Sequence, residues 1–450
     1  MDTKKLRQKI LDLAIRGKLV PQDPNDEPAS VLLERIKAEK EQLIKAGKIK
    51  RGKQSASSDT FPYENVPFDI PESWMWTTIG DVFVHNTGKA LNASNKDGVL
   101  MDYITTSNLY WDRFDLTVVK QMLFTDAEKE KCTVKYGDLL VCEGGDIGRA
   151  AIWSYDYEIR IQNHIHRLRG LCNISHRFYY YIFLLYKMRN FIGGKGVAIQ
   201  GLSSNDLHKL VVPLPPLEEQ MRIVQAVEDW FSIIDKIEQD KTDLENAIKQ
   251  IKSKILDLAI HGKLVPQDPN DEPAIELLRR INPDFQPCDN AHYKNLPNGW
   301  SICRLEDIVD YEQPQAYIVD STDYSEDYPI PVLTAGKSFI IGYTNETKGI
   351  CDNLPVIIFD DFTTDSHFVD FPFKVKSSAM KILRVKTGID IRYVCFFMSI
   401  TRLVGDTHKR YWISEYSKLT IPIPPKAEQE SIVHTVADLF GIFDSIIAEL

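Results

Sequence analysis

The chain has 450 residues, 43% of them hydrophobic, which is enough for several globular domains of roughly 100 to 200 residues each. Its 54 Lys+Arg against 64 Asp+Glu give a net charge of −10, so any contact with nucleic acid needs a local basic surface. Seven cysteines without a CxxC pair favour reduced thiols and exclude a disulfide framework. No apolar run approaches the roughly 20 residues of a membrane span, so we expect a soluble, cytoplasmic protein.

The chain contains an internal repeat. KILDLAIRGKLVPQDPNDEPA at 9–29 returns at 254–274, with Arg16 replaced by His261 as the only difference. VPLPPLEEQMRIVQAVEDWFSIID at 212–235 is similar to IPIPPKAEQESIVHTVADLFGIFD at 421–444. The intervening segments resemble each other only weakly. The sequence therefore predicts two copies of one frame that carry two different inserts.

The frame is predicted to be helical, because apolar residues recur at alternating steps of four and three along 217–260. This spacing is typical of a coiled-coil seam, with Lys241 as the only polar member. The predicted helix would be roughly 65 Å long. Its seam residues are Ile223, Val227, Trp230, Ile234, Ile237, Leu244, Ile248, Ile251, Ile255 and Leu258.

A second long helix is predicted to be split between the two chain ends. Its first half continues the repeat through Ile432, Val436, Leu439, Phe443 and Ile446, and its last half through Leu6, Ile10 and Leu13. We therefore predict an α+β fold. Two mixed α/β domains would be separated by two long antiparallel coiled-coil helices, in a circular pseudo-twofold arrangement. The alternative is that these helices only hold a dimer together.

Each insert contains a basic stretch. Residues 159–205 contain seven Lys or Arg and no acid, and residues 371–414 contain nine against two Asp. Within 159–166, isoleucines alternate with polar residues, as in a strand with one buried face. Arg, Lys, Gln and Asn suit phosphates and base edges, so these stretches favour DNA binding, with an ordinary solvated face as the alternative.

Candidate DNA contacts were chosen by residue type and by position on a predicted turn or strand face. In the first insert they are Arg149, Arg160, Gln162, Asn163, His164, His166, Lys195 and Gln200. In the second they are Lys337, Ser338, Tyr343, His408, Lys409 and Arg410.

No catalytic or metal-binding motif is present: the sequence contains no P-loop, GxSxG or HExxH. His164 and His166 have no third metal ligand beside them. Asp360, Asp361 and Asp365 only loosely resemble a nuclease cluster. We therefore predict no catalytic residue and no metal site.

Taken together, the motifs resemble the specificity (S) subunit of type I restriction-modification systems. The resemblance rests on the two repeats, on GDLLVCEGGDIGRAAIW with NHIHRLR in the first insert, and on LTAGKSFIIGYTNETKGI, VIIFDDFTTDSHFVDFPFKVKSSAMKIL and HKRYW in the second. It implies that each insert is a target recognition domain for one half of a bipartite, asymmetric double-stranded DNA site. The helices would set the spacing between the half-sites.

The resemblance also implies partners and cofactors. The helices would dock two methyltransferase (M) subunits that bind S-adenosylmethionine. Two restriction (R) subunits would bring ATP- and Mg-dependent cleavage. The chain itself would be non-catalytic and would bind no cofactor.

On this interpretation the chain divides into five segments. They are an N-terminal frame and linker (1–60), the first recognition domain (61–215), the central long helix with its repeat (216–290), the second recognition domain (291–424) and a C-terminal helix (425–450). Two rival interpretations are a nuclease or methyltransferase with its own specificity domains, and a coiled-coil scaffold for proteins.

Overall fold

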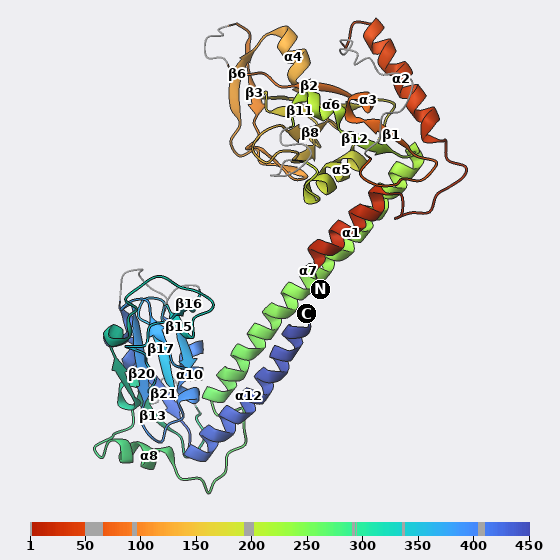
Figure 1. Cartoon of the computed structure of the whole chain (residues 1–450). Helices are drawn as coiled ribbons and strands as arrows, with labels where there is room; N and C mark the ends of the chain where they lie inside the picture. Colours follow the sequence, from red (N-terminus) through yellow and green to blue (C-terminus); the bar gives the residue numbers. More distant parts are fainter. Residues whose placement is uncertain are drawn as a thin grey trace. The chain divides into compact units, whose positions relative to one another are not determined.

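The computed structural model describes residues 2–49, 66–91, 97–192, 202–289, 293, 295–334, 338–403 and 410–450. The chain divides into two compact units, Met1–Gln239 (unit 1) and Asp240–Leu450 (unit 2) (Figure 1). Each unit contains one insert and part of the frame. The long helix α7 (Leu217–Ile260) belongs to both units.

Unit 1 consists of short strands with helices at their edges. Its helices besides α7 are α1 (Thr3–Ile15), α2 (Ala29–Lys45), α3 (Ile79–Val82), α4 (Asp126–Cys132), α5 (His176–Met188) and α6 (Ser204–Lys209). Its strands are β1 (Met75–Thr78), β2 (Phe83–Thr87), β3 (Val99–Ile104), β4 (Leu109–Tyr110), β5 (Arg113–Phe114), β6 (Lys120–Phe124), β7 (Thr133–Val134), β8 (Leu139–Cys142), β9 (Ala150–Ile152), β10 (Ile159–Ile161), β11 (Ile165–Gly170) and β12 (Val211–Leu214).

Unit 2 has helices α8 (Ala274–Ile281), α9 (Leu305–Ile308), α10 (Ile391–Ile400), α11 (Tyr411–Ser414) and α12 (Lys426–Glu449), with short 3₁₀ turns η1 (Pro314–Tyr317) and η2 (Tyr416–Lys418). Its strands are β13 (Ser301–Arg304), β14 (Val309–Glu312), β15 (Ile330–Leu333), β16 (Ile340–Thr344), β17 (Val356–Asp360), β18 (Ser366–Val369), β19 (Lys374–Val375), β20 (Met380–Val385) and β21 (Thr420–Ile423).

The two inserts share a strand topology. Unit 1 has a sheet ordered β2-β11-β8-β9, and unit 2 has the matching order β14-β20-β17-β18. A second sheet, β6-β3-β10-β7, corresponds to β16-β15-β19, and the pair β1-β12 corresponds to β13-β21. The two inserts therefore share a fold although their sequences are only weakly similar. Different sequences can do this when they keep the same alternation of buried and exposed residues, because that alternation specifies the register of strand pairing.

The hydrophobic core of unit 1 centres on α5. Ser175 caps this helix by accepting a hydrogen bond from the backbone N–H of Phe178, and the next turns bury a run of Tyr, Phe, Ile and Leu. β8 is buried at all of its positions because its alternate residues pack into two hydrophobic clusters, Leu139 and Val141 into one and Leu140 and Cys142 into the other. α10 occupies the corresponding place in the core of unit 2.

The frame helices pack antiparallel within each unit (Figure 1). In unit 1, Arg7 of α1 donates to Asp235 at 2.6 Å and to Glu238 at 3.1 Å on α7. In unit 2, Lys252 of α7 forms an ion pair with Asp444 of α12. The predicted continuous central helix is confirmed, since α7 runs for 44 residues.

Only part of the predicted seam is buried. Ile223, Val227, Ile234, Ile248 and Ile255 are buried, as are Ile10, Ile432 and Val436 on the helices that pack against α7. Leu6, Leu13, Leu258, Leu439 and Phe443 are half-buried. The prediction is wrong for Trp230, Ile237, Leu244, Ile251 and Ile446, which are 38–47% exposed. A two-helix contact covers one side of each helix, and these residues lie beside that contact.

The frame repeats form the same hydrogen-bonded cluster in each unit, in which a buried glutamate binds a tryptophan and a glutamine. We call this cluster the clasp. Glu219, at the start of α7, accepts from the indole Nε1 of Trp74 at 2.8 Å and from Gln22. In unit 2, Glu428 accepts from Trp300 at 2.9 Å and from Gln267 at 3.1 Å. Burial raises the pKa of both carboxyls, while these donors lower it. The clasp joins the repeat segment, the first strand of the insert and the long helix.

Gly17 and Gly262 complete the clasps. Each has a positive φ, +65° at Gly17 and +66° at Gly262. A Cβ at Gly17 would lie 2.4 Å from Cγ of Pro71, and one at Gly262 would lie 2.3 Å from Cγ of Pro297. Only glycine allows the repeat segment to turn this closely over the start of the insert.

We predict that Glu219→Ala lowers the free energy of unfolding by about 1 to 3 kcal/mol, because it leaves the buried indole N–H of Trp74 without an acceptor. Glu428→Ala should have a similar effect in unit 2. Urea unfolding followed by tryptophan fluorescence measures both changes. The neighbouring exposed Glu218→Ala is the control, and an equal loss in that variant would contradict the role of the clasp.

Candidate nucleic-acid interface

The basic stretch of the first insert is largely neutralised by the fold. Acidic residues outside 159–205 pair with its cations, and Arg167 is buried, with its guanidinium donating to the carbonyl of Thr133. The prediction that this stretch forms a basic surface is therefore wrong for its described residues. The ion pairs are Arg160–Glu158, Arg169–Asp138, Arg177–Asp112, Lys187–Asp146 and Arg189–Asp12.

The second insert uses its cations in the same way. Lys374 and Lys381 have side chains that are only 3% and 2% exposed, and both lie in ion pairs. Within the described part of the insert, Lys376, Lys386, Arg392 and Arg410 form no ion pair. The structural pairs are Lys374–Glu346, Lys381–Asp361, Arg384–Glu312 and Arg402–Asp365.

Polar loops meet at one end of the β2-β11-β8-β9 sheet in unit 1. The turn before β11 (162–164) lies between the loop after β2 (87–90) and the β8–β9 turn (143–146); we call these three segments the unit 1 loop edge. The backbone N–H of Asn163 donates to the carbonyl of Lys89, and that of Glu143 donates to the carbonyl of His164. These bonds hold the three segments together.

A pocket of about 460 Å³ opens at the unit 1 loop edge. Thr87, Lys131 and Asn163 contribute polar groups to its wall, and the buried Lys89 is held by Glu128 at 2.7 Å. Lys131 is exposed and has no ion-pair partner in the part of the chain that the structure describes. Sequence reasoning missed Thr87 and Lys131, because neither lies in an acid-free stretch and only the fold brings them to Asn163.

Several predicted contacts in the first insert are not available to DNA. His166 is fully buried, so its prediction as a DNA contact is wrong. Arg149 donates to the carbonyl of Thr106 and lies over the ring of Tyr110, and Arg160 has a side chain only 15% exposed. Both act in the structure of the insert.

Three predicted residues do lie on the unit 1 loop edge. His164 has a side chain 54% exposed, and Gln162 and Asn163 are half-buried. Lys195 and Gln200 lie outside the described residues, as do Lys337, His408 and Lys409 in the second insert.

Unit 2 has an edge at the corresponding place, formed by the β17–β18 turn (361–365) and Arg410. The guanidinium of Arg410 lies 5.9 Å from the ring centroid of Phe362, which is 37% exposed. The N–H of Tyr411 donates to the carbonyl of Asp361 and fixes this arrangement. We call Phe362 and Arg410 with their turn the unit 2 loop edge.

The other two described candidates in unit 2 lie on the β15–β16 hairpin. Ser338 is exposed in the connection between the strands. Tyr343 lines an apolar pocket of about 410 Å³ with Ile330, Ile340 and Phe371. This second position is separate in sequence from the unit 2 loop edge.

Three imidazoles form a hydrogen-bonded chain beneath the unit 1 loop edge. His85 on β2 is 2.9 Å from both His166 on β11 and His208 on α6, and His166 is 2.7 Å from the carbonyl oxygen of Leu202. Burial lowers the pKa of all three, most at His85, to about 3. All three rings are therefore neutral at pH 7.

The described residues contain no group of three His, Cys, Asp or Glu placed to hold a metal ion. Asp361 of the loosely nuclease-like cluster accepts from the backbone N–H of Trp412 at 2.8 Å and pairs with Lys381. It is 3% exposed and serves to anchor α11.

Comparison with known proteins places the chain in a family. The model of the type I restriction modification DNA specificity domain matches residues 71–250 and 297–450, one copy over most of each insert with its following helix. The chain belongs to this family.

Two curated relatives come from Escherichia coli. The chain is 30% identical to the type I restriction enzyme EcoAI specificity subunit over 70% of its own length and 64% of the relative's. It is 46% identical to the EcoR124I/EcoR124II specificity subunit over 32% of its own length and 37% of the relative's. The chain thus spans less than two thirds of the length of these relatives.

A similar fold is found in a solved structure whose description concerns the structural basis of complex assembly and conformational transition of the type I R-M system. The two chains are 16% identical with a TM-score of 0.57, over 85% of this chain and 96% of that one. The match shows that the arrangement of elements is shared.

We predict that Lys381→Met lowers the free energy of unfolding by about 3 to 5 kcal/mol, because it leaves the buried carboxylate of Asp361 without its positively charged partner. Denaturant titration measures the loss. Lys376→Met, at an exposed position of the same insert, should change stability by less than about 0.5 kcal/mol. Equal effects in the two variants would show that Lys381 is not a structural cation.

Proposed function

We propose that this chain is the DNA sequence-specificity subunit of a type I restriction-modification complex, acting in the cytoplasm and without catalytic residues of its own. Each insert recognises one half of a bipartite, asymmetric site on double-stranded DNA. The observation that carries the proposal is the repeated frame, which presents two inserts of the same topology with different side chains at their loop edges. Membership of the specificity-domain family supports it.

The two loop edges differ in the chemistry that reads bases. The unit 1 edge offers Asn163, Thr87 and Lys131, and an Asn amide pairs well with adenine. The unit 2 edge offers Arg410 above Phe362, and a guanidinium pairs well with guanine. Because the chemistry differs, the two half-sites are expected to differ, and the whole site is not a palindrome.

Replacing residues 291–424 by the second insert of another family member should change one half of the methylated site and leave the other half unchanged. The reason is that the first insert and the clasp of unit 1, formed by Trp74, Glu219 and Gln22, lie outside the exchanged segment. Genome-wide mapping of methylated bases in cells with the native and the exchanged chain measures this. A change in both halves would contradict separate reading, and no discrimination by either chain would favour a protein scaffold.

Exposed apolar residues on the frame helices support docking of partner subunits. On α7, Trp230 and Ile233 are 47% and 49% exposed, and the repeat places Ile442 of α12, 59% exposed, at the position equivalent to Ile233. Exposed large apolar side chains on a helix are typical of an interface with a partner. We call Trp230 with Ile233 in unit 1, and Ile442 with Ile446 in unit 2, the apolar stripes. One stripe in each unit is the pattern expected for two copies of the same partner, which we propose to be two methyltransferase subunits.

The stripe also explains the composition of α12. This helix has the length and hydropathy of a membrane span by composition, at a mean hydropathy of 1.5. Its apolar residues lie on two faces of the helix, one buried and one exposed. Ile432 and Val436 are buried against the core of unit 2, and Ile442 and Ile446 are exposed.

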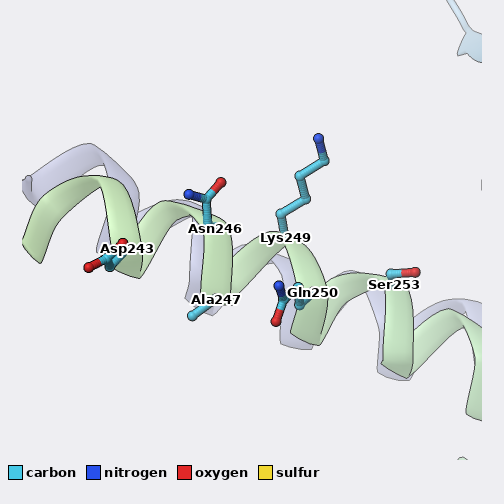
Figure 2. A pocket seen from close by; sticks show the side chains of 6 residues that line it. All are labelled: Asp243, Asn246, Ala247, Lys249, Gln250 and Ser253. Atoms are coloured by element: carbon cyan, nitrogen blue, oxygen red, sulfur yellow. The ribbon is translucent and has the colours of Figure 1, made fainter. Parts of the chain in front are cut away.

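The part of α7 that belongs to unit 2 has mainly polar side chains on one face. A shallow pocket of about 670 Å³ in unit 2 is lined by successive turns of this helix (Figure 2). The lining residues are Asp243, Asn246, Ala247, Lys249, Gln250 and Ser253.

The remaining partners follow from the same proposal. Two restriction subunits would assemble with the two methyltransferase subunits and bring ATP and Mg. S-adenosylmethionine would bind to the methyltransferase subunits, and this chain would bind no cofactor. The continuous helix α7 would set the distance between the half-sites, since a helix rises about 1.5 Å per residue.

We predict that Ile233→Asp removes one methyltransferase subunit from the complex, because a carboxylate would be desolvated in the interface. Ile442→Asp should do the same in unit 2, and the double variant should bind neither subunit. Size-exclusion chromatography with light scattering of the co-expressed complex gives the stoichiometry. Ser232→Asp, exposed on another side of the same turn, is the control and should leave the complex intact.

A further inference from the structure

The imidazole chain in unit 1 has only one arrangement of protons when its rings are neutral. The carbonyl of Leu202 accepts only, so Nε2 of His166 donates to it. Nδ1 of His166 then accepts from Nε2 of His85, and Nδ1 of His85 accepts from Nε2 of His208. Every ring donates one hydrogen bond, and one lone pair is left at Nδ1 of His208.

This arrangement tolerates one added proton and no more. The first can bind Nδ1 of His208, which takes no part in the chain, and every bond survives. A second proton must occupy a nitrogen that now accepts a bond, so one of the two contacts at His85 becomes an N–H facing an N–H. The chain therefore opens once His85 or His166 becomes charged in addition to His208.

Charged groups around the rings act in both directions on their pKa values. Arg167 on β11 and Lys131 on α4 disfavour a cation at His85, and Lys40 on α2 disfavours one at His208. Asp81 on α3 and Glu143 after β8 act in the opposite direction at His208 and His166. Burial is the largest influence on all three rings and lowers each pKa.

The three hydrogen-bonded imidazoles connect the segments of the unit 1 loop edge. His85 lies two residues before Thr87 on β2, and His166 lies two residues after His164 at the start of β11. His208 joins β2 to α6 through its contact with His85, and α6 leads into β12 and α7. Movement of any one ring would shift the loops that carry Thr87, Asn163 and His164.

Unit 2 has a phenol and an ammonium group at the positions that two of the imidazoles occupy in unit 1. β14 pairs with β20 as β2 pairs with β11, so Tyr311 corresponds to His85 and Lys381 corresponds to His166. Lys381 lies 5.8 Å from the ring centroid of Tyr311 and forms an ion pair with Asp361. Unit 2 of the same protein therefore serves as a control for the effect of the three imidazoles in unit 1.

We propose that His85, His166 and His208 are positioning residues for the first half-site: while uncharged they hold the unit 1 loop edge in its reading geometry, and acid abolishes discrimination of the first half-site but not of the second. The proposal rests on the proposed function, because it assumes that unit 1 reads a half-site.

The sign of the pH effect follows from the shifts. An unfolded histidine titrates near pH 6.5, and the folded rings titrate lower. Their contribution to stability is complete above about pH 6.5 and is lost as the pH falls toward the folded pKa values. Added positive charge strengthens non-specific DNA binding, so the ratio of specific to non-specific affinity is the useful measure.

The test uses the complex of this chain with its methyltransferase subunits, on a site identified by methylation mapping. Affinity is measured between pH 8 and pH 4.5 for three duplexes: the intact site, the site with the first half-site scrambled, and the site with the second scrambled. Because the pKa of His85 is about 3, the loss in this range would come from a charge on His166 in addition to His208, and discrimination of the first half-site should fall at least tenfold. Discrimination of the second should change less than twofold.

Variants separate positioning from folding. His85→Phe removes both ring contacts and should lower first half-site discrimination at pH 8, with little further change in acid. His85→Gln keeps an N–H donor toward His166 and an oxygen acceptor toward His208, so it should restore discrimination at pH 8. Tyr311→Phe is the matched control in unit 2 and should change neither half-site.

Two results would overturn the inference. One is a parallel loss of discrimination at both half-sites in acid; the other is discrimination of the first half-site that changes neither with pH nor in the His85→Phe variant. If His85→Phe does not fold, judged by circular dichroism, the pH profile of the native complex decides alone. If the native complex discriminates neither half-site at pH 8, the proposed function fails instead.

Discussion

The architecture depends on a buried carboxylate that accepts a hydrogen bond from an indole. Glu219 and Glu428 begin the helices that follow the two inserts, and each binds the tryptophan at the start of the insert before it. The adjacent Gln220 and Gln429 extend this contact, accepting from the backbone N–H of Ser175 and of Asp390 where α5 and α10 begin. Strand, core helix and long helix are thereby fixed together, which allows the surface loops of an insert to vary.

Much of this organisation could be predicted from the sequence. The near-identical repeat revealed two frames, and the heptad spacing gave the long helix, since both depend on local pattern. The exposure of Trp230 and Ile237 could not be predicted in the same way. The heptad pattern indicates that a residue packs against an apolar neighbour. It does not indicate whether that neighbour belongs to the same chain.

The interface was harder to predict because charge in sequence is not charge on a surface. Arg169 and Lys381 come from basic stretches, yet each is neutralised by an acid distant in the sequence. Only Asn163, His164 and Arg410, together with half-buried Gln162, lie on the two loop edges among the described candidates. Lys131 and Thr87 join them through the packing of α4 and β2, which no spacing rule contains.

The exposed apolar side chains of α7 and α12 have a practical consequence. In water, Trp230, Ile233 and Ile442 would be covered by whatever apolar surface is nearest. A chain made in excess over its partners would find that surface on other copies of itself and form aggregates. If the proposed partner subunits cover these helices, their supply limits how much of the chain stays dispersed in a cell, and purification should begin from co-expression.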